Sequence, residues 1–284
     1  MSLQWYPGHM TRARRELAAL MPSQDGVIEV LDARLPRASS NPLLAELRGD
    51  KPVIKVLTKS DLADPEVTRA WISHFEVVPG VRALASRTDR PAETRKRIAE
   101  LSRHLAEHRG ADKAVRLLIA GVPNSGKSTL LNILANRAVA KVGDKPAVTK
   151  DQQTVTLADG MLITDTPGLM WPKLDDQAGA HRLAFAGSLP DTAIDYLSVG
   201  LFGAEYLIAH YPKRLMARYA LASPPTDATA LLSEIGRRRG GLRKGGEVDL
   251  HKAAELLVHE FRAGTLGLIS LETPTGDPPA AAPG

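Results

Sequence analysis

The first 170 residues or so alternate short apolar runs with longer amphipathic stretches. Apolar runs of this kind, ended by polar or glycine-containing turns, are typical of buried strands, and apolar positions three and four residues apart are typical of helices. The expected strands are residues 26–31, 52–57, 81–85 and 115–120, and the expected helices are residues 1–22, 41–48, 91–109 and 128–136. Strands that alternate with helices predict an α/β fold with a mostly parallel sheet covered by helices.

The pattern changes in the second half of the chain. Residues 154–157 and 161–164 flank an Ala-Asp-Gly turn, which predicts a hairpin. From about residue 180 to 270 the apolar positions follow a helical period, and no strand alternation is evident. The last residues are rich in Pro, Ala and Gly, a composition typical of disorder. The expected division is an α/β domain at residues 1–180, a small all-helical domain at 181–272 and a disordered tail at 273–284.

Composition narrows the function classes. The 284 residues include no cysteine, which excludes disulfides, thiol nucleophiles, iron–sulfur clusters and cysteine-based zinc sites, and this fits a reducing, cytoplasmic location. No apolar run is long enough to span a bilayer, so we expect no membrane partner. The net charge of +5 permits nucleic-acid binding without demonstrating it. Aromatic residues make up only 4%, so base stacking is not expected to be the main binding mode.

Residues 121–128 (GVPNSGKS) carry the strongest chemical signal, because they follow an expected strand and precede an expected helix. They fit the pattern G-x-x-x-x-G-K-[ST], in which glycines let backbone N–H groups face phosphate oxygens at a helix N-terminus. Lys127 would contact the β- and γ-phosphates, and the Ser128 hydroxyl would bind Mg²⁺. The alternative is a chance match in a glycine-bearing loop. The nucleotide contacts expected from this phosphate loop and the residue after it are Asn124, Ser125, Gly126, Lys127, Ser128 and Thr129.

A second loop, Asp165-Thr166-Pro167-Gly168, follows the hairpin. A carboxylate at a strand end downstream of a phosphate loop suits Mg²⁺, so Asp165 is a candidate metal ligand. The Gly168 amide would sense a γ-phosphate. The alternative is a plain surface turn, because Pro-Gly is good turn chemistry on its own.

Residues 58–61 (TKSD), at the end of an expected strand, resemble the guanine-reading N/T-K-x-D motif of GTPases. The Asp61 carboxylate can accept hydrogen bonds from both N1–H and N2–H of guanine, a pair that adenine does not offer, and the Lys59 stem can lie over the base. This base motif precedes the phosphate loop by about 60 residues, whereas ordinary GTPases have the opposite order. The order resembles that of a circularly permuted GTPase.

Further motifs resemble one family, ribosome-biogenesis GTPase A, and they keep its order over nearly the whole chain. They are residues 5–10 (WYPGHM), 32–36 (DARLP), 40–42 (SNP), 143–149 (GDKPAVT), 245–249 (GGEVD) and 261–267 (FRAGTLG). The resemblance implies a cytoplasmic GTPase that acts late in assembly of the large ribosomal subunit. It also implies a permuted P-loop GTPase domain followed by a helical domain that contacts rRNA. We expect the chain to be monomeric off the ribosome.

The sequence departs from the family at several places. Thr58 stands where the family usually has Asn, Ala147 stands where it often has Gly, and Ser86 is only a loose match for the base-side loop. Leu169 follows residues 165–168 where many GTPases have a water-orienting Gln, so the catalytic group would come from elsewhere. The resemblance points to His9 for that role, and the alternative is a histidine that packs or caps the first helix.

The resemblance also assigns Thr149 as the switch residue that binds Mg²⁺, the nucleotide and the attacking water, beside Lys127 at the phosphates. It suggests K⁺ beside Asn124 as a stimulating ion, while a loop Asn that makes a turn hydrogen bond is the alternative. Residues 104–108 (HLAEH) fit a zinc-hydrolase pattern, but they lie on a strongly charged helix and are interpreted as a solvated face.

The densest positive charge lies at residues 237–244. The family resemblance favours contact with the rRNA backbone over a merely solvated loop. The candidate RNA-binding residues are Arg237, Arg238, Arg239, Arg243 and Lys244. Two other functions stay open: a nucleotide-dependent docking switch with negligible turnover of its own, and a permuted GTPase with another RNA client.

Overall fold

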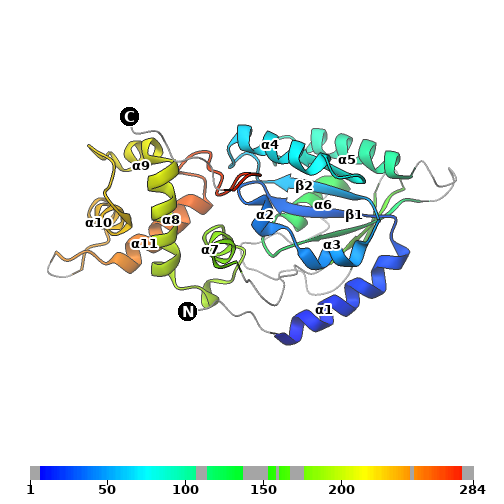
Figure 1. Cartoon of the computed structure of the whole chain (residues 1–284), viewed down its shortest axis with the longest axis horizontal. Helices are drawn as coiled ribbons and strands as arrows, with labels where there is room; N and C mark the ends of the chain where they lie inside the picture. The colour runs from blue at the N-terminus through cyan, green and yellow to red at the C-terminus, as the bar shows by residue number, and fades with distance from the viewer. Residues whose placement is uncertain are drawn as a thin grey trace.

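The computed structural model describes residues 7–106, 114–136, 153–157, 160–166, 176–243 and 246–276. Figure 1 shows an α/β part and, beside it, a group of helices formed by the later residues. The predicted fold class, a mostly parallel sheet followed by helices, is confirmed.

The α/β part contains a six-stranded sheet in the order β3-β2-β1-β4-β6-β5. All neighbours are parallel except β5 and β6, which form the predicted antiparallel pair. The strands are β1 (Gly26–Asp32), β2 (Val53–Thr58), β3 (Val81–Ala85), β4 (Arg116–Gly121), β5 (Gln153–Thr156) and β6 (Leu162–Asp165). Strands β1, β2 and β3 lie side by side in chain order, and β4 then pairs with the other side of β1. The β1–β4 boundary is therefore a topological switch point, where open α/β sheets bind ligands beyond the carboxyl ends of their strands.

Helices cover both faces of this sheet, because alternate residues of the central strands are apolar on each side. Ile28 and Val30 of β1 face the core shared with α5 and α6, and Val27 faces the core shared with α1 and α3. The helices are α1 (Pro7–Leu20), α2 (Pro36–Ser39), α3 (Pro42–Arg48), α4 (Pro65–Glu76), α5 (Pro91–Ala106) and α6 (Lys127–Ala135). Helix α4 is an addition to the predicted elements.

The later residues form α7 (Gln177–Phe185), α8 (Tyr196–His210), α9 (Pro212–Tyr219), α10 (Ala228–Arg239) and α11 (Leu250–Arg262). Four of them begin at an aspartate whose carboxylate accepts a hydrogen bond from a backbone N–H of the first turn, which is the usual way to satisfy these donors. These caps are Asp176, Asp195, Asp227 and Asp249. The predicted core positions Ala253, Leu257 and Phe261 are buried, and Leu256 packs against the same core.

The helices share their core with the α/β part, because Leu35, Ala38 and Val122 belong to the same buried cluster. After α11 the chain returns toward the sheet as a C-terminal strap (residues 264–272). The N–H of Ile269 donates to the Leu62 carbonyl at 3.0 Å, and that of Leu271 donates to the Arg34 carbonyl at 2.6 Å. Residues 273–276, predicted as the start of a disordered tail, form a turn, and the remaining tail lies outside the described residues.

Candidate nucleotide-binding site

The phosphate loop joins β4 to α6, as predicted, and it lies at the switch point of the sheet. A Cβ at Gly121 would lie 2.4 Å from the carbonyl oxygen of Val30, so only glycine permits this approach to β1. Gly126 has a φ of +97°, which also favours glycine, and α6 begins directly after it. The Lys127 ammonium donates to the carbonyls of Gly121 and Val122, each at 3.1 Å. The loop thus closes around the lysine side chain, and Ser128 and Thr129 lie in the first turn of the helix.

Lys127 is buried, with 7% of its surface exposed. Burial lowers its pKa to about 8, and the negative charge of Asp165 opposes that shift. A charged phosphate beside the ammonium would add to the effect of Asp165 and favour the protonated form. The lysine is therefore suited to bind an anion at neutral pH.

Asp165 ends β6, and the register places it opposite Ile119 of β4, next to the phosphate loop. Its side chain is fully buried. The hydroxyl of the next residue, Thr166, donates to the Ile119 carbonyl at 2.9 Å and fixes the strand end against β4. The structure therefore brings Asp165 to the phosphate loop, as the sequence predicted. Gly168 and Thr149 lie outside the described residues.

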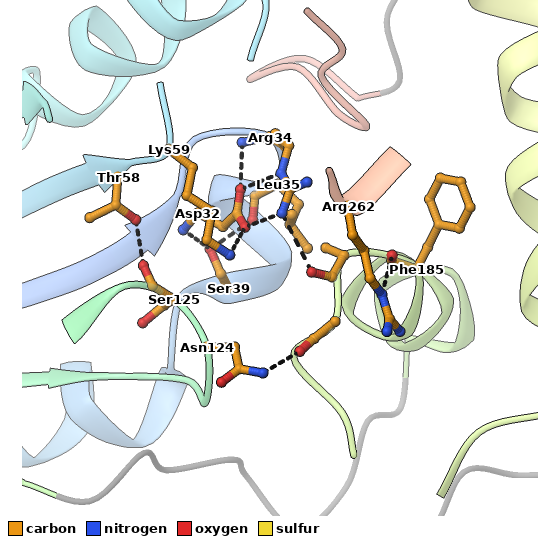
Figure 2. Close-up of polar contacts among 12 residues, drawn as sticks. Asp32, Arg34, Leu35, Ser39, Thr58, Lys59, Asn124, Ser125, Phe185 and Arg262 are labelled. Atoms are coloured by element: carbon orange, nitrogen blue, oxygen red, sulfur yellow. Dashed lines mark hydrogen bonds and ion pairs between the residues drawn. The ribbon is translucent and has the colours of Figure 1, made fainter. Parts of the chain in front are cut away.

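The base motif lies at the carboxyl end of β2, which is two strands from β4 in the sheet. It therefore lies on the same side of the sheet as the phosphate loop, where the parallel strands end. Its first residue contacts the phosphate loop directly. The Thr58 hydroxyl is directed at two carbonyls, that of Leu31 at 2.9 Å and that of Ser125. A Cβ placed on Gly126 would lie 3.2 Å from the Thr58 Cβ. Thr58, where the family usually has Asn, therefore holds the phosphate loop against β2 (Figure 2).

Ser60, the residue before Asp61, joins the base motif to Ser86. The Ser60 hydroxyl donates to the Ser86 carbonyl at 2.9 Å, and the Ser86 N–H donates to the Leu57 carbonyl at 2.8 Å. The Asp61 Oδ1 atom is buried and accepts no hydrogen bond from the residues that the structure describes. A buried carboxylate oxygen needs a donor. The N–H groups at the edge of a guanine base would satisfy it, so this observation fits the guanine-reading role.

Sequence reasoning missed the group that holds Lys59. The Lys59 ammonium lies 2.9 Å from Asp32 Oδ2, and Arg34 donates to the same carboxylate through Nε at 2.9 Å and Nη2 at 2.8 Å. Asp32 is fully buried. Burial alone would raise its pKa, but the charges of Arg34 and Lys59 hold the pKa well below its usual value. The signals in the sequence are the family-like motif at residues 32–36 and the acid and base two residues apart within it.

Asn124 also has a partner that the sequence did not indicate. Its amide nitrogen donates to the Gly187 carbonyl at 2.8 Å, just beyond α7. From the other side, Arg262 of α11 donates to the carbonyls of Ala184 at 2.8 Å and Phe185 at 3.2 Å. Figure 2 shows these contacts on the two sides of the segment that ends α7. The phosphate loop is thus bonded to a segment that also anchors the helical part.

The other predicted site residues are less informative. His9 lies in α1, but its side chain is outside the described part of the chain. His104 belongs to α5, whereas Glu107 and His108 of the zinc-like pattern are not among the described residues. Within the described ranges, no three His, Cys, Asp or Glu residues are placed to hold a metal ion together. None of the described helices has the length and apolar character that crossing a membrane requires.

The arginine cluster (Arg237, Arg238, Arg239 and Arg243) is exposed at the end of α10 and in the loop after it. Each guanidinium faces a carboxylate: Glu234 for the first two, Glu260 for the third at 3.9 Å, and Asp249 for the fourth at 3.0 Å. Exposed ion pairs are weak, and a guanidinium has five N–H donors, so these contacts leave donors for a phosphate backbone. Lys244 lies outside the described residues.

The permuted strand order, the phosphate loop and the base motif together define a circularly permuted P-loop GTPase. A family model described as 50S ribosome-binding GTPase matches residues 116–194. Ribosome biogenesis GTPase A of Bacillus pumilus is 40% identical, with 96% of this chain and 99% of the relative covered. Its counterpart in Thermotoga maritima is 31% identical, with 96% of this chain and 95% of the relative covered. The chain belongs to the ribosome biogenesis GTPase A family, and it is a GTP hydrolase.

A solved structure agrees with this assignment. The crystal structure of GNP-bound YlqF from T. maritima superposes with a TM-score of 0.67 at 30% identity, over 93% of this chain and 99% of that chain. The predicted family and the permuted GTPase fold are therefore confirmed.

Proposed function

We propose that this GTPase binds the large ribosomal subunit and acts in its late assembly, hydrolysing GTP in a cycle that the subunit stimulates. The match to a family model described as 50S ribosome-binding GTPase carries this proposal. The exposed arginine cluster supports it, because such a surface suits an rRNA backbone. The proposed division of labour is a GTPase domain at residues 1–180 and a ribosome-binding helical domain at 181–272.

In the nucleotide site, the base motif and Ser86 would bind guanine, with the buried Asp61 oxygen accepting from the base edge. The phosphate loop would hold the phosphates, with Lys127 and the N–H groups that open α6 as donors. Asn124, Ser125, Gly126, Ser128, Thr129, Thr149 and Gly168 complete the proposed nucleotide contacts.

Magnesium would be held by oxygen donors, which it prefers: the Ser128 hydroxyl, Thr149 and the Asp165 carboxylate. When bound, the ion neutralises charge on the phosphates. Lys127 would stabilise the same charge from the protein side, and Thr149 would orient the attacking water. His9 is the proposed group that completes catalysis when the subunit docks, and K⁺ beside Asn124 would add positive charge at the phosphates.

The test is GTP hydrolysis with and without purified large subunits, in K⁺ and in Na⁺, with small subunits and ATP as controls. We expect stimulation that is specific for GTP and for large subunits. Stimulation by small subunits alone would assign another client, and an absence of stimulation would refute the proposed cycle. Equal rates of GTP hydrolysis in K⁺ and Na⁺ would show that K⁺ has no specific part in catalysis. If a His9→Ala variant kept the turnover that large subunits stimulate, His9 would have no catalytic role.

A further inference from the structure

Asp32 is the common partner of two cations at the edge of the nucleotide site. Its Oδ2 accepts from the Lys59 ammonium at 2.9 Å and from Arg34 Nη2 at 2.8 Å, while Oδ1 accepts from the Arg34 backbone N–H at 3.0 Å and from Nε at 2.9 Å. The Asp32 N–H is also fixed, because it donates to the Ser39 hydroxyl at 3.1 Å. A carboxylate held at both oxygens cannot rotate, so it defines one position for the lysine ammonium.

Lys59 needs such a guide. Its backbone has a φ of +54°, an uncommon conformation for a residue other than glycine, and its side chain keeps 27% of its surface exposed. A free lysine stem samples many rotamers, and ordering it costs conformational entropy. The bond to Asp32 fixes the end of the stem, and therefore orders it before any nucleotide arrives.

Arg34 links this arrangement to the helical part of the molecule. Its guanidinium is 2% exposed, lies 4.8 Å from the centre of the Phe261 ring, and donates to the Ala186 carbonyl at 3.4 Å. Phe261 in turn stacks on Phe185 at 4.3 Å. The arginine that holds Asp32 is therefore itself held by Phe261 of α11 and by the carbonyl of Ala186, the residue after α7.

We infer that Asp32 is a positioning residue for Lys59, and that its bond to the ammonium sets the lysine stem in the orientation that binds the guanine base. This inference rests on the proposed guanine-reading role of the base motif. It predicts that Asp32 contributes to nucleotide affinity only through Lys59.

A double-mutant cycle on GDP affinity tests this dependence, with a fluorescent GDP analogue as the probe and the full chain as the protein. The variants are Asp32→Asn, Lys59→Met and the double mutant; Met keeps an apolar stem but has no ammonium. We expect Asp32→Asn to weaken binding about tenfold in the wild-type background and by less than about twofold in the Lys59→Met background. Equal losses in both backgrounds, or no loss in wild type, would overturn the inference.

A matched control separates positioning from general damage to the sheet. Glu29 lies three residues earlier on the same strand, is also buried, and pairs with Lys55 of β2. Glu29→Gln should lower the melting temperature without changing GDP affinity. If Asp32→Asn fails to fold, Asp32→Glu goes through the same cycle, because it keeps the buried negative charge but displaces it from Lys59.

The outcomes distinguish this inference from the proposed function. Wild-type protein that shows no preference for GDP over ADP would refute both. Wild-type protein that prefers GDP, combined with an additive cycle, would refute only the positioning role of Asp32.

Discussion

Glu272 in the C-terminal strap gives a pH dependence that can be worked out from the structure. Its side chain is 2% exposed and accepts hydrogen bonds from the N–H groups of Arg37 and Ala38. Burial raises its pKa from 4.5 to about 7, against the lowering effect of these donors and of the charge of Arg182. The buried site therefore favours the protonated carboxyl, although the N–H groups of Arg37 and Ala38 bond more strongly to the ionised form.

The sign and size of this pH dependence follow from the linkage between protonation of Glu272 and folding. Because the folded state holds this proton more tightly than the unfolded state, the stabilisation is fully present below about pH 4.5 and is lost as the pH rises through about 7. The two values imply a change of about 3 kcal/mol in the free energy of unfolding. Glu272→Gln removes the titration, yet its amide oxygen can accept the same two N–H groups. The variant should therefore be more stable than wild type above neutral pH and similar to it in acid.

The assay is urea unfolding of wild type and Glu272→Gln at about pH 5 and about pH 8, followed by tryptophan fluorescence and circular dichroism. Trp71 is a suitable reporter, because its indole N–H donates to the Glu272 carbonyl at 3.3 Å. Glu205→Gln, at an exposed position on α8, is the control and should shift stability equally at both pH values. If the difference between Glu272→Gln and wild type is also the same at both pH values, the reasoning is refuted.

Three further predictions concern ligand binding. Affinity for GDP should fall as the pH rises above about 8, because Lys127 then loses the proton that binding requires. Calorimetry in buffers of different ionisation enthalpy should detect the proton taken up on binding. An affinity that does not change with pH would contradict this prediction. Thr58→Val should weaken GDP binding by roughly twofold to tenfold, because it removes one hydrogen bond to the phosphate loop, whereas Thr58→Ser should bind like wild type. The affinities are measured by fluorescence titration of a GDP analogue. Equal affinities of the Val and Ser variants would refute the role of the Thr58 hydroxyl in holding the loop. Arg243→Gln should lower by about one the slope of log affinity for large subunits against log salt concentration. Arg69→Gln, at an exposed arginine of α4, is the control and should leave this slope unchanged. Equal slopes for wild type and both variants would exclude Arg243 from the interface.

Local sequence pattern predicted the strands well, because the central ones are buried along nearly their whole length. Every residue of β1 is buried, so its apolar run stands out from the flanking polar residues. Helix α4 was not predicted, because only Thr68 and Trp71 are buried in it and the apolar stripe is narrow. The phosphate loop and Asp165 could be placed from sequence, since each follows directly from a strand end.

The contacts between motifs could not be predicted in this way. Thr58 meets the Ser125 carbonyl across 67 positions of the chain, and Asn124 meets the Gly187 carbonyl across 63. Such pairs depend on how α7 and the sheet pack in three dimensions, and no local period encodes them. The same holds for Asp32, whose importance appears only when Lys59 is placed beside it.

The C-terminal strap also has a consequence for the growing chain. Arg37 and Glu272 are 235 positions apart, an interval that takes roughly 10 to 50 s to synthesise at about 5–20 residues per second. Once Asp165, which ends the last strand, has been synthesised, the sheet residues and both nucleotide motifs exist without the strap until it follows, and the carbonyl of Arg34 lacks the N–H of Leu271 that covers it in the finished protein. The support of the nucleotide site is thus completed only after residues 264–272 have been synthesised. A chain that stops before the strap carries every nucleotide motif but lacks the segment that fastens the helical part to α2.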